Sequence, residues 1–427
     1  MKRLALAAFA GLGLAAGAAQ LPRGALLGVQ LGPNPQGKGA VVQALVPGGT
    51  AAAAGLARDD VVVDVNGAPV AGPADVVAGV SRLHAGDRIA VRYMRDGAPH
   101  EAAGTLAPRP YESADDVETL YEAIDAGGSL RRTVVTMPRA DGRHPAVLYL
   151  TGIGCFSQED ASLQSTESRL LYGLSRAGFV TMRVEKTGMG DSQGPACASD
   201  AGDLEREVAG YAAGLKALRE HANVDPERVF ILGLSIGGLE APLLARQGNV
   251  RGVVVVNTLA RPFLEYLLET IRRQDKLHRM PYDELDRHMR LVERCNHEGL
   301  VEKRDDVVRA SPECAEHLSY PAPLSFMRQW AAIDPAVEWK KVAAPVLIVY
   351  GGKDYIATGD TDAPLLRDIV ESFHPGNATL VLMPTMDHFM GHVETMEASL
   401  AKTSGPFGAF EPALLDVVRD WLERQAG

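Results

Sequence analysis

The sequence predicts an α/β fold, with a mostly parallel sheet, helices on both of its faces and a helical lid insertion, preceded by a small separate domain. From about residue 140 onward, short apolar runs alternate with amphipathic stretches, the order that gives parallel strands joined by helices. Before residue 110, strand-like runs meet at Asn66-Gly67 and Asp96-Gly97, which are typical hairpin turns. A chain of 427 residues has room for both parts, each with its own core.

The first twenty residues have the features of an export signal. Lys2 and Arg3 precede a short apolar run, and an A-x-A-like pattern of small residues lies between Ala16 and Ala19. We therefore expect residues 1–19 to be a signal peptide and the protein to be exported, either periplasmic or secreted. The competing interpretation is a membrane anchor, but the run is short for a span and rich in alanine and glycine.

The charge of the chain argues against a nucleic-acid partner. The formal net charge is −11, whereas nucleic-acid binding requires basic patches. Removal of the signal peptide would take away two positive charges and make the net charge more negative. No later stretch is long and apolar enough to cross a bilayer, so we expect a soluble mature protein without stable membrane insertion.

Residues 20–109 are expected to fold as the small first domain. Ala54-Gly55-Leu56 precedes a strand at Val61–Val65, and a helix follows at 73–83. This order resembles a PDZ domain of the type attached to bacterial periplasmic proteases. One departure is Asp59, because the family usually has glycine before the aspartate at this point.

The resemblance to PDZ domains implies a groove that binds the C terminus of an extended peptide as an added strand. Leu27, Gly28 and Val29 match the loop whose backbone amides capture the peptide carboxylate. Arg23, just before this loop, would add positive charge. The alternative is that this copy of the fold serves only as a structural spacer.

Residues 110–427 are expected to form the second domain, after a proline-containing linker. A hairpin that turns at Gly127-Gly128 opens the domain. The alternation stops at about 258–341, where amphipathic helices beginning at Pro262 and Pro281 predict the lid insertion. The other expected elements are strands at 144–152, 179–185, 229–233, 252–257, 344–352 and 378–384, and helices at 168–177, 203–221 and 238–246.

Ser235 lies in the string Gly-Leu-Ser-Ile-Gly, between an expected strand and an expected helix. A sharp turn of this kind holds the serine hydroxyl exposed above the sheet, and glycine on both sides relieves Cβ clashes. The backbone N–H of Ile236, at the start of the helix, would point toward an oxyanion formed there. A serine hydroxyl is a weak nucleophile, so Ser235 needs a base from elsewhere in the chain.

Two later loops supply partners for Ser235 in the order serine, acid, histidine that this turn requires. Asp354 and His388 each follow a strand and are expected at the same edge of the sheet as Ser235. His392 is the nearest rival histidine, about one helical turn further on. Asp387 is a rival acid, but as the neighbour of His388 it should point elsewhere. We expect Ser235 to be the nucleophile, His388 the base and Asp354 the acid that orients it.

The second block as a whole, lid included, resembles the α/β-hydrolase superfamily. The stretch 223–238 is similar to the approach to the nucleophile in esterases and prolyl-oligopeptidase-like peptidases. The loop after residue 150 stands where this family places its second oxyanion donor. A lipase-type His-Gly-Gly-Gly is absent there, so Ile153 and Gly154 are both candidates. The resemblance implies an acyl-enzyme on Ser235, with neither a metal nor an organic cofactor.

The four cysteines are expected to form two disulfides, as suits an exported chain with an even number of them. In the strand order of this family, the loops that carry Cys155 and Cys197 leave neighbouring strands side by side. Cys295 and Cys314 both fall in the lid insertion. We therefore expect Cys155–Cys197 and Cys295–Cys314, one of three connectivities; the alternative is four reduced cysteines.

These features together predict an exported serine hydrolase that cleaves small-molecule carboxylic esters, with a PDZ module for peptide or protein binding. One alternative is a serine peptidase of prolyl-oligopeptidase-like type, which the PDZ resemblance and the approach to Ser235 favour. Another is an inactive scaffold or binding protein that keeps the hydrolase fold.

Overall fold

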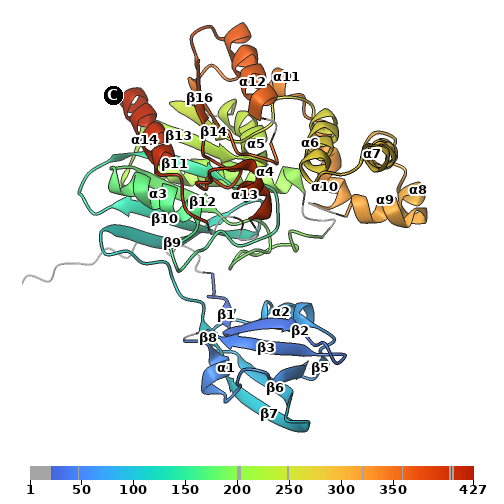
Figure 1. Cartoon of the computed structure of the whole chain (residues 1–427). Coiled ribbons are helices and arrows are strands. Elements are labelled where there is room, and N and C mark those ends of the chain that lie inside the picture. The colour runs from blue at the N-terminus through green and yellow to red at the C-terminus, as the bar shows by residue number, and fades with distance from the viewer. Residues whose placement is uncertain are drawn as a thin grey trace, which may run out of the picture.

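The computed structural model has a small N-terminal domain and a larger C-terminal domain (Figure 1). It describes residues 21–46, 48–199, 203–247, 250–319, 322–357, 359–402, 405 and 408–427. The expected signal peptide, residues 1–19, lies outside these residues. Within the same ranges, no helix combines the length and the apolar composition of a membrane span.

The N-terminal domain is an antiparallel sheet with short helices packed against it, drawn in blue in Figure 1. Its strands follow the order β2-β3-β4-β6-β7, and β5 pairs with β4. Apolar side chains of alternate strand positions, such as Val62, Ile89 and Val91, are buried in one core. Its elements are β1 (Ala25–Leu26), β2 (Val29–Pro33), β3 (Ala40–Leu45), α1 (Thr50–Ala53), β4 (Val61–Val65), β5 (Ala68–Pro69), α2 (Pro73–Val80), β6 (Arg88–Arg95), β7 (Ala98–Thr105) and β8 (Ala107–Pro108).

The C-terminal domain is built around an eight-stranded sheet, counted over the described residues, in the order β16-β15-β14-β13-β11-β12-β10-β9. Strand β10 pairs antiparallel with β9 and β12, and the remaining pairs are parallel. The parallel strands read as continuous apolar runs because helices cover both faces. The strands are β9 (Val117–Asp125), β10 (Leu130–Pro138), β11 (His144–Leu150), β12 (Val180–Val184), β13 (Val224–Leu234), β14 (Gly252–Val256), β15 (Val346–Gly351) and β16 (Ala378–Met383).

Helices on the two faces of this sheet bury separate apolar cores. On one face, α3 (Thr166–Arg176) and the C-terminal α14 (Pro412–Ala426) pack against the strands. On the other face lie α4 (Leu204–Glu220), α5 (Ile236–Ala245) and α12 (Gly359–Phe373). The predicted α/β architecture is therefore confirmed. Helices α3, α4 and α5 lie within two residues of their expected bounds at either end, whereas no bounds were predicted for α12 and α14.

The lid insertion contains more helices than the sequence predicted. The expected pair is present as α6 (Phe263–Leu277) and α7 (Tyr282–Asn296), which pack together through Ile271 and Met289. Four short helices and a π-helical turn follow, and their charged, irregular sequence gave no clear helical period. They are η1 (His297–Val301), α8 (Asp305–Ala310), α9 (Pro312–His317), α10 (Leu324–Ala331) and α11 (Pro335–Trp339).

The cysteines pair as the sequence analysis expected. Cys155 bonds to Cys197, which joins the loop after β11 to the loop after the neighbouring strand β12. Cys295 bonds to Cys314 within the lid, where both side chains belong to the core between the lid and α5. The first bridge therefore fixes a loop at the sheet edge, and the second fixes the lid internally.

A buried ion cluster joins the two domains. The Asp191 carboxylate accepts hydrogen bonds from Arg23 Nη1 at 2.8 Å, Arg132 Nε at 3.2 Å and Arg109 Nη2 at 2.5 Å. Arg23 also pairs with Glu159 at 2.6 Å. Although burial opposes ionisation, these hydrogen bonds lower the pKa of Asp191. Buried charges of both signs therefore tie the start and end of the small domain to the large one.

Candidate active site

Ser235 lies at the sharp turn between β13 and α5, as its flanking glycines indicated. Its backbone has φ 54° and ψ −122°, a left-handed conformation that is strained for a residue with a side chain. A Cβ atom on Gly237 would lie 2.4 Å from the Leu150 carbonyl oxygen, so only glycine fits beside the neighbouring strand. The serine N–H donates to the Val256 carbonyl at 2.9 Å, which holds the turn against β14.

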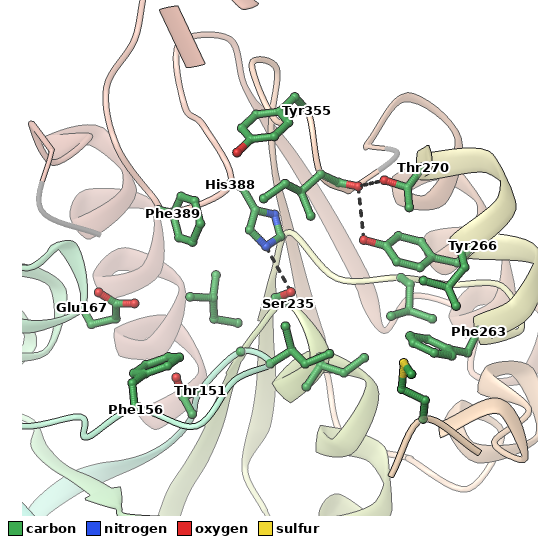
Figure 2. A pocket seen from close by; sticks show the side chains of 18 of the residues that line it. Thr151, Phe156, Glu167, Ser235, Phe263, Tyr266, Thr270, Tyr355, His388 and Phe389 are labelled. Carbon is green, nitrogen blue, oxygen red and sulfur yellow. Dashed lines mark hydrogen bonds between the residues drawn. The ribbon is translucent and has the colours of Figure 1, made fainter. Parts of the chain in front are cut away.

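A hydrogen-bond chain links Ser235, His388 and Asp354. Ser235 Oγ lies 3.1 Å from His388 Nε2 (Figure 2). His388 Nδ1 lies 2.8 Å from Asp354 Oδ2. A carboxylate only accepts, so Nδ1 carries the ring proton and Nε2 is free to accept the serine proton. His388 and Asp354 are both buried, with 5% and 4% of their surface exposed. This arrangement can activate a serine hydroxyl.

Asp354 and His388 are held in place by further hydrogen bonds. The second oxygen of Asp354 accepts backbone N–H bonds from Ile356 at 2.7 Å and Ala357 at 2.8 Å. Asn257, at the end of β14, donates from Nδ2 to the backbone oxygens of Asp387 and His388, and its Oδ1 accepts from Gly351 N–H. Asn257 thus connects the loops after β15 and β16 that carry the acid and the histidine.

The rival acid and the rival histidine have other partners. Asp387 Oδ1 accepts N–H bonds from Phe389 and Gly391, so this carboxylate shapes the histidine loop from within. His392 lies between two other carboxylates, and its side chain is 38% exposed. The structure therefore brings His388, not His392, to Ser235.

The candidate oxyanion donors lie in two segments next to Ser235. Ile236 is the first residue of α5, where the helix leaves its N–H groups without internal partners. In the other segment, a Cβ on Gly152 would lie 3.3 Å from Ser235 Cβ, so the loop after β11 passes close to the serine. Ile153 lines the cavity at this point, whereas a Cβ on Gly154 would meet the Phe156 ring. Of these two residues, Ile153 is the one that lines the cavity.

Lys186 fixes the orientation of the peptide group between Gly152 and Ile153. Its Nζ donates to the Gly152 carbonyl at 3.0 Å and pairs with Glu207 at 2.8 Å, and all of these side chains are buried. The C=O and N–H of a trans peptide point in opposite directions, so this bond turns the Ile153 N–H away from Lys186. Glu240 of α5 lies nearby, and burial raises the pKa of its carboxyl well above the usual value.

A cavity of about 790 Å³ opens at Ser235 and His388. Figure 2 shows two sides of it. On the lid side, Phe263, Tyr266 and Thr270 of α6 face the serine. On the side that we call the α3 side, the lining includes Phe156 and Glu167. Tyr149, which interacts electrostatically with Glu167, and Asp160, which accepts from the Ser165 N–H just before α3, belong to the same side. Gln158 lines the cavity two residues before Asp160.

Two carboxyls near the α3 side have raised pKa values. Burial raises the pKa of Glu167, which lies in the first turn of α3. Burial also raises the pKa of Glu185 to about 7, although Ser157 Oγ and the backbone N–H of Gln158 donate to it. Raised carboxyl pKa values often occur in functional clefts, although structural networks also produce them.

The predicted PDZ loop has the expected position, but Arg23 does not. Leu27, Gly28 and Val29 lead into β2, an edge strand of the small sheet, with α2 beside it. The Arg23 guanidinium instead turns toward the C-terminal domain and is bound by Glu159 and Asp191. The prediction that Arg23 contributes to a carboxylate-binding loop is therefore corrected, because its charge is already paired.

The sequence analysis did not find Asn257, Lys186 or Glu167. Only Asn257 had a usable signal, as a polar residue that ends a buried valine strand at the edge where the acid and histidine loops meet. The contacts of the other two depend on packing between distant segments. Across the described ranges, His, Cys, Asp and Glu side chains form no group of three or more that could hold a metal ion.

Similarities to known proteins agree with this fold. A PDZ domain model matches residues 25–105, and an alpha/beta hydrolase family model matches residues 147–402. Esterase EstD from Thermotoga maritima is 23% identical over 292 residues, which are 67% of this chain and 64% of that protein, so the chain spans less than two thirds of that relative. The magnetosome formation protease MamE from Paramagnetospirillum magneticum is 40% identical over 81 residues, or 19% of this chain and 11% of that protein.

Among solved structures, Est1E from Butyrivibrio proteoclasticus with ferulic acid bound covers 71% of this chain and 98% of its own, with 16% identity and a TM-score of 0.46. The match to the alpha/beta hydrolase family model by itself spans more than half of the chain. The protein therefore belongs to the alpha/beta hydrolase family and carries an N-terminal PDZ domain.

Proposed function

We propose that this protein is an exported serine hydrolase that cleaves carboxylic esters through an acyl-enzyme on Ser235. The observation that carries the proposal is the hydrogen-bond chain from Ser235 Oγ to His388 and Asp354. The cavity beside the serine gives a small ester access to the hydroxyl. The similarity to esterase EstD favours an ester over other acyl substrates.

In the proposed reaction, Ser235 Oγ attacks the ester carbonyl carbon while its proton passes to His388 Nε2. The carbonyl oxygen becomes an oxyanion, which the N–H groups of Ile236 and Ile153 stabilise. The C–O bond to the alcohol then breaks, and the leaving oxygen takes the proton from His388. A water molecule attacks the acyl-enzyme in the same way and releases the acid, while Asp354 stabilises the charged imidazole.

Export and peptide binding are the other parts of the proposal. Disulfides persist in oxidising compartments, so the two bridges support an exported protein. Strand β2 lies at the edge of its sheet, which leaves one side available for an added peptide strand beside α2. Val77 of α2 is 63% exposed and offers an apolar contact on this helix. We propose residues 20–109 as the peptide-binding domain and 110–427 as the hydrolase domain.

A fluorophosphonate probe tests the nucleophile directly, because it reacts with an activated serine and needs no knowledge of the substrate. We expect a single labelled peptide that contains Ser235, and no labelling of Ser235→Ala. Hydrolysis of 4-nitrophenyl esters of increasing acyl length should then be compared with hydrolysis of peptide 4-nitroanilides. If the probe labels Ser235 and the protein hydrolyses the amides but not the esters, the protein is a peptidase and not an esterase. Absence of both labelling and hydrolysis would favour an inactive scaffold.

Peptide binding is tested with full-length Ser235→Ala protein, which cannot consume a ligand. Pairs of peptides with a free or an amidated C terminus should be screened for binding. We expect binders that require the free carboxylate, because backbone amides near Gly28 would capture it. If no peptide pair shows a preference for the free carboxylate, the spacer interpretation of this domain is the better one.

A further inference from the structure

The α3 side of the cavity contains a buried hydrogen-bond acceptor that lacks a partner. Gln158 donates its amide to the Val184 carbonyl, which leaves Oε1 buried and without a partner among the described residues. Tyr149 beside it is only 1% exposed, and its hydroxyl interacts with the Thr151 side chain. Since a buried polar atom without a hydrogen bond is costly, the Gln158 oxygen points to a ligand group that donates.

Glu167 supplies a carboxyl to the same side of the cavity. In Figure 2 its carboxyl group lies on the same side of the cavity as the Phe156 ring, across from α6. Its one side-chain hydrogen bond over the described ranges comes from the neighbouring Thr166 Oγ1, at 3.2 Å, and no ion pair is found for it there. Burial raises the pKa of this carboxyl, although the positive charge of Arg183 opposes the shift. Arg183 is itself paired with Glu112, so Glu167 has no salt bridge of its own among the described residues.

The fixed charges around this side favour a cation over an anion. Arg183 also lines it, and one guanidinium N–H remains unpartnered in the described structure, but its charge is neutralised by two hydrogen bonds to Glu112. Although burial opposes ionisation, hydrogen bonds from Ser162 and Ser165 lower the pKa of Asp160 and keep it charged. Asp160 thus adds negative charge without a cationic partner of its own.

We propose that the α3 side of the cavity is a subsite for a primary ammonium group on the substrate, with the Glu167 carboxylate as its counter-ion. An ammonium group carries three donors and no acceptor, which matches the acceptor oxygens of Gln158 and Glu167. The Phe156 ring on the same side of the cavity adds a surface that attracts cations. This inference rests on the proposed ester hydrolysis and specifies its substrates as amino-group-bearing esters.

The test compares charged esters with uncharged esters of the same length. The pairs are 4-nitrophenyl β-alaninate with butanoate and 4-nitrophenyl 6-aminohexanoate with heptanoate. The readout is the kcat/KM of each amino ester divided by that of its uncharged counterpart. We expect this ratio to exceed 1 in the native enzyme at one or both lengths, and to fall by roughly tenfold or more in Glu167→Gln.

Glu205→Gln is the matched control, because Glu205 is an exposed acid in the first turn of α4. It changes the net charge by the same amount and should keep the native ratio. An unaltered ratio in Glu167→Gln at both lengths would overturn the inference, as would a native preference for both uncharged esters.

A binding measurement on the inactive variant tests the ammonium subsite independently of the proposed esterase activity. Ser235→Ala protein is titrated with hexylammonium chloride and, separately, with hexan-1-ol, and the heats are measured by calorimetry. We expect the ammonium ion to bind more tightly and Glu167→Gln to remove the difference. Equal binding of the two ligands would overturn the subsite, even if the native enzyme hydrolyses esters. Tighter ammonium binding that depends on Glu167 would support it, even if no tested ester is hydrolysed.

Discussion

Two histidines lie four residues apart in the loop after β16, and each has a carboxylate partner at Nδ1. They differ in the group that contacts the second ring nitrogen, Nε2. His388 is buried, with Asp354 at Nδ1 and the Ser235 hydroxyl at Nε2. His392 is partly exposed, with Glu411 at Nδ1 at 2.7 Å and Glu394 at Nε2 at 3.1 Å.

The difference between these histidines lies in the state of the imidazole that each site stabilises. Hydrogen bonds from His392 to Glu411 and Glu394 raise the pKa of this imidazole, so its two carboxylates favour the charged ring. A charged ring has no free acceptor and cannot take a proton from a hydroxyl. His388 has a carboxylate on one side only, and its Nε2 is left to accept. A carboxylate beside a histidine is therefore not enough to make a general base.

The largest effect on kcat should come from removing a member of the hydrogen-bonded triad of Ser235, His388 and Asp354. Ser235→Ala and His388→Ala should each lower kcat on a 4-nitrophenyl ester by on the order of 10⁶-fold, because the triad acts as a unit. His392→Ala is the matched control and should retain most of the native kcat. Steady-state kinetics measure all three variants, and an inactive His392→Ala that is still folded would reverse the assignment of the base.

A smaller loss of kcat should follow when the hydrogen bond from Lys186 to the Gly152 carbonyl is removed. The double variant Lys186→Met/Glu207→Gln removes the bond to the Gly152 carbonyl without leaving Glu207 charged and unpaired. We expect kcat to fall by up to roughly 10²-fold while KM changes little, since an oxyanion donor acts in the transition state. Glu207→Gln alone keeps the lysine bond and should lose much less. Equal kcat values in the two variants would argue against this role of Lys186.

The two disulfides should differ in their effect on turnover. Both close chain loops, with sequence separations of 42 and 19 residues, so their removal should cost stability of about 4 and 3 kcal/mol in the chain-entropy model. Only Cys155–Cys197 fixes the loop that carries Ile153. Cys155→Ser/Cys197→Ser should lower kcat several-fold below the melting transition. Cys295→Ser/Cys314→Ser should mainly lower the melting temperature, and a similar fall in kcat for both pairs would contradict the distinction.

The smallest effect should be a pH dependence of stability from His392. The carboxylates raise the pKa of the folded imidazole above its unfolded value of about 6.5. The stabilisation is therefore fully present below about pH 6.5 and is lost as the pH rises through the folded pKa. Chemical denaturation at a series of pH values should show this loss in the native protein and not in His392→Gln. An identical pH profile in both would show that the pairs at His392 do not contribute.

The proposed triad could be predicted because parallel strands place their carboxyl ends at one edge. Ser235, Asp354 and His388 follow β13, β15 and β16, so strand order and chain order together brought them near one another. The prediction of the triad needed only the apolar pattern of the strands and the residues just after them. The pairing of Cys155 with Cys197 also needed the strand order that the resemblance to α/β-hydrolases implies.

The features that escaped prediction depend on contacts between segments far apart in the chain. Arg23 looked like a free charge beside the PDZ loop, because nothing local indicates its pairing with Asp191, 168 residues later. Glu167 drew no attention because it lay just before the helix expected at 168–177, and only the cavity distinguishes it. The helices after α7 were missed because tertiary packing stabilises such short, charged segments more than their local sequence does.

The backbone at Ser235 also implies a trade-off between reactivity and robustness. A residue with a side chain in this left-handed conformation costs about 1–3 kcal/mol, which the surrounding fold must supply. Glycine would relieve that strain but would have no hydroxyl to offer. The proposed nucleophile is thus a position at which the protein gives up some folding stability. Selection for thermal stability alone would therefore tend to replace this serine.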